Sequence, residues 1–211
     1  MHRFRRSLFL LCAFGLAARC GPPQRTSGSG PLGAIEEWTR GPVCWLLLPE
    51  ELKEARRLRS SREAVVFIDA FWRRRDPEPE EPGNPFLQAF EERVAAADRL
   101  YTENGERGSL TDRGRALILL GPPPLLNIGQ QAVPVWEPGS SGARPVVATR
   151  RMKVESWRYQ LSELPPRLAQ RLTAAGESGG VALDFAVEPD RTYLLEGHKL
   201  LDQAARAAVP E

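Results

Sequence analysis

Two short stretches of this 211-residue sequence carry the polar side chains that could do chemistry. The first is Arg75-Asp76 together with Asn84, and the second is the run Thr111-Asp112-Arg113-Gly114-Arg115. A carboxylate can act as a general base or accept several hydrogen bonds, and the planar guanidinium of arginine matches a carboxylate with two parallel bonds. These clusters could therefore bind a polar or anionic ligand, supply a base, or fix chain segments to one another.

Both interpretations stay open for the two aspartates. In the structural one, Asp112 or Asp76 caps a turn and pairs with an arginine, and we expect Asp112 to be mostly buried and bonded within its own turn or to Arg75 or Arg113. In the functional one, the cluster forms a charged pocket for a ligand, with Asp112 as a possible base. We favour the structural interpretation.

The sequence lacks the residue patterns that other common catalytic, metal and cofactor sites need. The only histidines are His2 and His198, and no Cys or His spacing is typical of a zinc site. The sequence also has neither a phosphate-binding glycine loop with its lysine nor a dinucleotide fingerprint. We therefore assign no catalytic residue and expect no metal and no cofactor, although an enzyme built on carboxylates remains possible.

The N-terminus predicts export. Three arginines precede an apolar run of eleven residues, Leu8 to Ala18, which is too short to span a bilayer and is typical of a signal peptide covering residues 1–19. The stretch from Leu16 to Gly21 resembles a bacterial lipoprotein box, whose cysteine, here Cys20, becomes lipidated. Arg19 departs from the small residue expected before that cysteine, and the alternatives are simple secretion or an uncleaved anchor.

The remaining composition limits the partners. Formal net charge is +2, but without the four arginines of the leader 25 basic residues face 27 acidic ones, so we expect no nucleic-acid binding. With Cys20 as the lipid site, Cys44 is alone in the mature chain, and no disulfide framework is expected. Residues 20–34 are rich in Gly, Ser and Pro and predict a flexible tether before a single domain at 35–211.

The residues around the second cluster predict that it forms a turn before a buried strand. Ala116 to Leu120 is a short apolar run between Gly114 and Gly121, which is typical of a buried strand. Pro122 to Pro124 should end that strand, and Gly114 should supply positive φ in a turn before it.

Helices dominate the first half of the sequence and strands the second. Leu46–Arg59, a Ser60-capped segment up to Arg75 and an Asn84-capped segment up to Tyr101 carry helical apolar spacing. The predicted strands are Val154–Leu161, Val181–Val187 and Thr192–Leu195, and residues 127–148 are predicted to form a long excursion. This order favours an α+β fold, with N-terminal helices packed on a mainly antiparallel sheet of about four strands.

Two signatures in this order resemble a known family. Phe71 to Pro79 through Asn84, followed by Gly108 to Arg115 and Ile118 to Pro122, is similar to the GWxTD domain, a bacterial family named for its Gly-Trp-x-Thr-Asp motif. The resemblance spans roughly Leu46 to Leu195. Ser109 replaces the tryptophan of the motif, and Glu81 and Pro85 also depart from the family pattern. The positions that match, and that we regard as candidate binding residues, are Arg75, Asp76, Asn84, Thr111, Asp112, Arg113, Gly114 and Gly121.

The resemblance implies an exported protein, often a lipoprotein, in a family without an established biochemical activity. We therefore expect a lipid-tethered, non-catalytic binding or assembly module in the periplasm or at the outer membrane, with a protein partner in the cell envelope. The alternative is a hydrolase-like envelope enzyme that uses Asp112 or Asp76 together with arginines.

Overall fold

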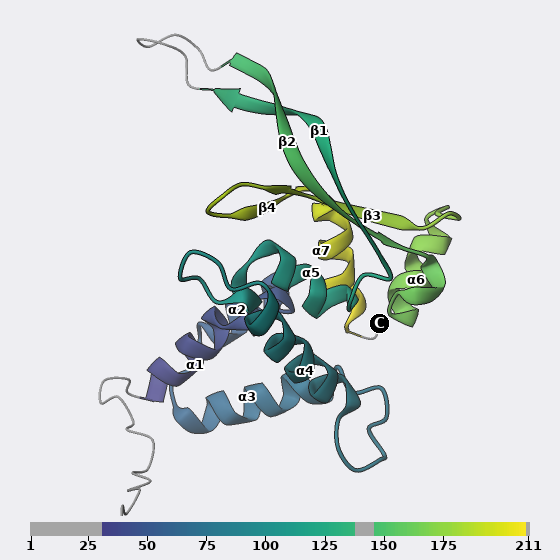
Figure 1. The fold of residues 1–211 in the computed structure, drawn as a ribbon. Coiled ribbons are helices and arrows are strands. Elements are labelled where there is room, and N and C mark those ends of the chain that lie inside the picture. Colours follow the sequence, from purple (N-terminus) through teal and green to yellow (C-terminus); the bar gives the residue numbers. More distant parts are fainter. Residues whose placement is uncertain (1–30, 138–145, 210–211) are drawn as a thin grey trace, which may run out of the picture.

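The computed structural model describes residues 31–137 and 146–209, and the predicted leader and Cys20 lie outside them. Helices gather on one side of the molecule and a four-stranded sheet on the other, with the helices Asp112–Leu120 and His198–Ala207 between them (Figure 1). This arrangement confirms the predicted α+β class. The helices are α1 (Pro31–Arg40), α2 (Pro49–Ala55), α3 (Ser61–Arg73), α4 (Pro85–Leu100), α5 (Asp112–Leu120), α6 (Pro166–Ala174) and α7 (His198–Ala207), with short 3-10 turns at Pro42–Trp45, Gly108–Leu110 and Leu161–Glu163.

The predicted helix starts of α3 and α4 are confirmed. The Ser60 hydroxyl accepts the backbone N–H of Glu63 at 3.2 Å, and the Asn84 side chain accepts that of Leu87 at 2.9 Å. Each bond satisfies one of the amides that a helix leaves unpaired at its first turn. The predicted helix over Leu46–Arg59 is shorter than expected, because it begins at Pro49 and ends at Ala55.

The predicted strand at Ala116–Leu120 is wrong, because these residues form the second half of helix α5. The Thr111 hydroxyl accepts the N–H of Gly114 at 3.1 Å, so the polar residues before the apolar run are the first turn of a helix. All five residues of the run are buried, because α5 lies between the sheet and the other helices. A helix that is apolar on every side is typical of the interior of a protein, and such a short run cannot be told from a buried strand by its pattern.

The sheet is antiparallel throughout, in the order β1 (Leu125–Glu137), β2 (Val146–Tyr159), β3 (Val181–Val187) and β4 (Thr192–Glu196). The predicted β3–β4 hairpin is confirmed. The predicted excursion at residues 127–148 is wrong, because most of it belongs to a long β1–β2 hairpin that projects away from the helices (Figure 1). Pro134 and Gly129 hid β1, since both residues are uncommon inside strands.

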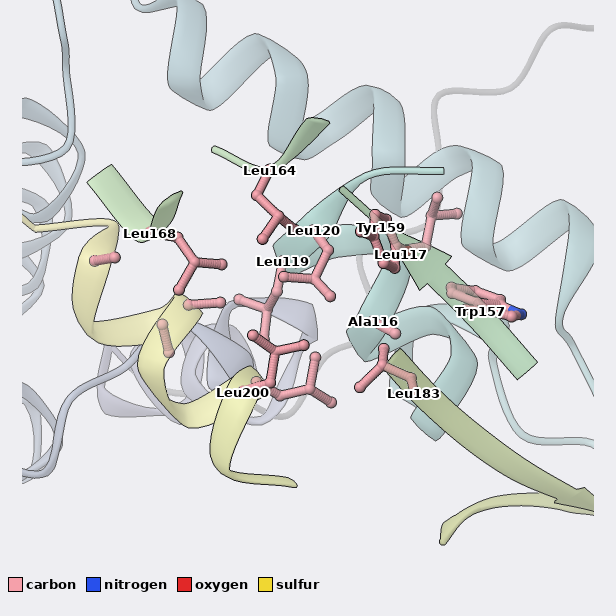
Figure 2. Close-up of a cluster of buried hydrophobic side chains, with 14 of the residues drawn as sticks. Ala116, Leu117, Leu119, Leu120, Trp157, Tyr159, Leu164, Leu168, Leu183 and Leu200 are labelled. Carbon is pink, nitrogen blue, oxygen red and sulfur yellow. The ribbon is translucent and has the colours of Figure 1, made fainter. Parts of the chain in front are cut away.

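The main core lies between the sheet and α5. Leu117, Leu119 and Leu120 of α5 contact a cluster that includes Trp157 and Leu183 of the sheet (Figure 2). Leu164 from the turn before α6, Leu168 from α6 and Leu200 from α7 complete it. The core therefore holds α5 in a fixed position against the sheet, which places the polar N-terminus of that helix.

Candidate functional site

The N-terminus of α5 is bonded to the outer edge of the sheet. Asp112 is the first residue of α5, and its Oδ2 accepts the backbone N–H of Leu194 in β4 at 2.8 Å. Asp112 is half-buried. The prediction that its carboxylate bonds to Arg75, to Arg113 or within its own turn is wrong. The reason is that β4 is an edge strand, which presents unpaired amides to the element packed beside it.

A second carboxylate makes the same contact two residues along β4. Glu103 Oε1 accepts the backbone N–H of Thr192 at 2.9 Å. Glu103 lies in a tight turn with Glu106, in which Asn104 and Gly105 both have positive φ. Residues 192 and 194 point the same way because strand backbones alternate. Glu103 and Asp112 together therefore occupy both outward amides at the start of β4.

Arg113 connects this edge to the middle of the sheet. Its Nη2 donates to Glu103 Oε2 at 2.9 Å, and its Nη1 lies 3.5 Å from Glu155 Oε2. Glu155 in turn accepts the indole N–H of Trp157 at 2.6 Å, and the Arg113 guanidinium lies over the Tyr101 ring. Arg113 thus bridges two largely buried carboxylates, which makes the network a link between α4, α5 and the sheet.

Arg115 connects α5 in the opposite direction. Its Nη2 donates to Asp202 Oδ1 of α7 at 2.6 Å, and its guanidinium lies over the Trp45 ring. Together Asp112, Arg113 and Arg115 fix one end of α5 to β4, to the middle of the sheet and to α7.

The two motif glycines serve different purposes. Gly114 lies inside α5 and does not have positive φ, so the predicted turn glycine is wrong. A Cβ at this position would lie 1.8 Å from the carbonyl oxygen of Gly108, so glycine permits close packing here. Gly121 has a φ of 89° and ends α5 in a conformation that favours glycine. Its carbonyl accepts the hydroxyl of buried Tyr159 at 2.9 Å.

The first cluster is a buried ion pair elsewhere in the molecule. Arg75 is 0% exposed and makes two parallel bonds to Glu51 of α2, at 2.9 and 2.7 Å. It also donates to the carbonyl oxygens of Leu46 and Phe71. Burial alone would raise the pKa of Glu51, but its hydrogen bonds with Arg75 and the Leu48 amide and the positive charge of Arg75 lower it overall.

Asp76 and Asn84 shape the segment between α3 and α4. Asp76 accepts the backbone N–H of Glu78 at 3.0 Å in a local turn. Asn84 caps α4 and also donates from Nδ2 to the carbonyl of Trp72 at 2.9 Å, which joins the two helices. Within the described residues no hydrogen bond or ion pair joins this cluster to Asp112 and Arg113. The structure thus places the two predicted sets of polar residues in separate networks, and the sequence analysis left out three of their partners, Glu51, Glu103 and Glu155.

The second cluster, Thr111 to Arg115, is called the signature cluster below. It borders a depression of about 320 Å³ lined by Glu103, Asp112, Arg191 and Tyr193. Its two inner carboxylates already accept strand amides, so this arrangement can stabilise the fold without a ligand. Among residues 31–137 and 146–209, no group of three metal-ligating side chains comes together. In the same part of the chain, no helix is both long and apolar enough to cross a membrane.

The comparisons with known proteins identify the family. Residues 37–143, about half of the chain, match the GWxTD domain, while neither the curated proteins nor the solved structures give a match. The matched range contains both polar clusters and ends before β2, so Trp157 and the β4 amides that complete the Asp112 network lie beyond it. The chain belongs to the GWxTD domain family.

Proposed function

We propose that this protein is an exported, non-catalytic binding module of the bacterial cell envelope. In this proposal Cys20 carries a lipid, and an extended segment of a partner protein pairs with the free edge of β1. The observation that carries the proposal is the difference between the two edges of the sheet: carboxylates cover amides of β4, whereas no strand among residues 31–137 and 146–209 pairs with the outer side of β1. An open edge strand is a template for strand addition by another chain.

The register defines the free part of β1. Since Thr192 and Leu194 direct their amides outward, alternation across the sheet directs the backbone groups of Leu126, Ile128 and Gln130 away from β2. Pro134 also directs its backbone nitrogen away from β2, so its missing N–H costs no bond to that strand, as expected for proline in an edge strand. Leu126 and Ile128 are 43% and 57% exposed, so the free edge also offers apolar side chains to a partner.

The carboxylates support a non-catalytic role. Asp112 and Asp76, the residues that an enzyme would use, each accept a backbone amide. In each group one carboxylate oxygen accepts a backbone amide, which gives both residues a structural task that needs no substrate. No contact of the described residues favours the hydrolase alternative.

Site-specific photo-crosslinking in intact cells tests the partner. A crosslinker at Leu126 should capture an envelope protein, whereas one at Leu100, which is 58% exposed on α4, should not. Ile128→Pro removes an outward amide that the fold does not use, so it should abolish capture at Leu126 and leave the protein folded. Capture that is equal at both positions, or unchanged in Ile128→Pro, contradicts strand addition.

Metabolic labelling with a fatty-acid probe tests the tether. The wild-type protein should be labelled and fractionate with membranes, and Cys20→Ser should lose the label. Equal labelling of the two proteins, or no labelling of either, contradicts lipidation at Cys20.

A further inference from the structure

A larger pocket lies away from the signature cluster, between α4, α6, α7 and the C-terminal end of α5. Its volume of about 530 Å³ is within the range of small-molecule sites. Most of its wall is apolar and includes Phe86, Phe90, Leu119, Leu164 and Ala204. The body of the pocket therefore suits a hydrocarbon.

Two arginines in the wall have no acidic partner among the residues that the structure describes. Arg93 is half-buried, and the bond it makes is from Nη1 to the carbonyl of Ile118 at 3.0 Å. Arg167, also half-buried, makes no hydrogen bond or ion pair within the described residues. Arg75 reaches the same pocket, but Glu51 neutralises it. The carboxylate in the wall, Glu163, is exposed and accepts the Gln160 amide at 2.6 Å.

A cation that is partly removed from water and lacks a counter-charge is costly. Burial is the largest influence on the pKa of the Arg93 guanidinium and lowers it, while Tyr159 acts in the opposite direction. An anion that entered the pocket would supply the missing charge, and a carboxylate matches the guanidinium with parallel hydrogen bonds.

We propose that this pocket binds a single alkyl chain that ends in a carboxylate, with Arg93 and Arg167 binding the carboxylate and the apolar wall covering the chain. The apolar side chains and the unpaired arginines border one cavity, and a ligand with both properties satisfies them together. This proposal is independent of strand addition at β1 and of lipidation at Cys20.

Calorimetry with the purified full chain tests it, with decanoate as the probe below its micelle concentration. Decanoate should bind. The two control compounds are acetate, which has the charge without the chain, and 1-decanol, which has the chain without the charge. Each should bind at least about tenfold more weakly, since a charged hydrogen bond and a buried alkyl chain each contribute more than that factor.

Variants locate the site. Arg167→Met removes a charge that the fold does not use, and it should weaken decanoate binding about tenfold or more. Ala89→Phe fills the pocket from α4, where Ala89 is half-buried, and should abolish binding. Arg93→Met should also abolish it, but this variant loses a bond to α5 and needs a thermal unfolding control. Arg99→Met, an exposed position on the same helix, is the matched control and should bind like the wild type.

Several results would overturn the proposal. Undetectable decanoate binding would do so, as would equal affinity for 1-decanol. Unchanged affinity in Arg167→Met and in Ala89→Phe would place any binding elsewhere, for example on the leader.

Discussion

Asp112 at the start of α5 and Leu194 in β4 are joined by a 2.8 Å bond from the strand amide to the carboxylate. The bond connects a helix N-terminus to a sheet edge, so the family's Thr-Asp dipeptide has two structural tasks: Thr111 caps the helix and Asp112 covers the strand. An exposed edge amide would otherwise be open to pairing with another chain.

The first prediction concerns this bond. Asp112→Asn should lower the free energy of unfolding by about 1–3 kcal/mol, because the accepting group loses its charge. A urea titration measures the change. Asp190→Asn is the matched control, since Asp190 borders the same depression but is exposed, and it should shift stability by less than about 0.5 kcal/mol. An Asp112→Asn protein of full stability would contradict the structural role.

The second prediction concerns the buried ion pair. Glu51→Gln leaves the buried charge of Arg75 without an anion and should cost about 3–5 kcal/mol. The double variant Glu51→Leu, Arg75→Met should be clearly more stable than Glu51→Gln, because an apolar pair leaves no charge unpaired. Arg74→Met removes the exposed partner of Glu51 and should cost less than about 1 kcal/mol. Denaturant midpoints of the variants distinguish these outcomes.

The third prediction concerns acid. The pKa of Glu51 is lowered in the folded protein, so its stabilising contribution is complete above its ordinary value and is lost as the pH falls through the folded value. The stability difference between wild type and Glu51→Gln should therefore shrink as the pH falls below about 4.5, the ordinary value of the glutamate carboxyl. Unfolding titrations at several pH values measure it, and a constant difference would contradict the lowered pKa.

The fourth prediction compares two buried hydroxyls of the motif. Thr111→Ala removes the cap of α5 and should cost about 1 kcal/mol. Ser109 is fully buried, and its hydroxyl makes no well-aligned hydrogen bond in the part of the chain that the structure describes, although it lies beside the Asp98 carboxylate and helps to lower the pKa of that group. Ser109→Ala should therefore be neutral or stabilising by up to about 1 kcal/mol. Equal losses in the two variants would mean that Ser109 has an unrecognised partner.

The fifth prediction concerns Gly114. Alanine normally stabilises a helix relative to glycine by about 1 kcal/mol, but here its Cβ would collide with the Gly108 carbonyl. Gly114→Ala should therefore be destabilising, by about 1–3 kcal/mol. A Cβ at Gly129 would meet no atom within 4 Å, so Gly129→Ala is the matched control and should be neutral or slightly stabilising. Thermal unfolding measures both changes.

Local chemistry in the sequence was sufficient for some of these features. Ser60 and Asn84 predict the starts of α3 and α4 because a cap bonds to an amide only three residues away. Alternation from Val181 to Val187 predicts a strand with one face in the core. The polar residues of both clusters could be singled out because each is uncommon beside apolar runs unless it has a partner.

Tertiary structure alone decided what those residues contact. Ala116 to Leu120 fit a buried strand and a buried helix equally well, and the packing between the sheet and α7 selects the helix. The partners of Asp112 and Arg75 are Leu194 and Glu51, which are distant in the sequence. Periodicity and capping act over a few residues, whereas ion pairs, edge amides and pocket walls depend on which elements meet in space.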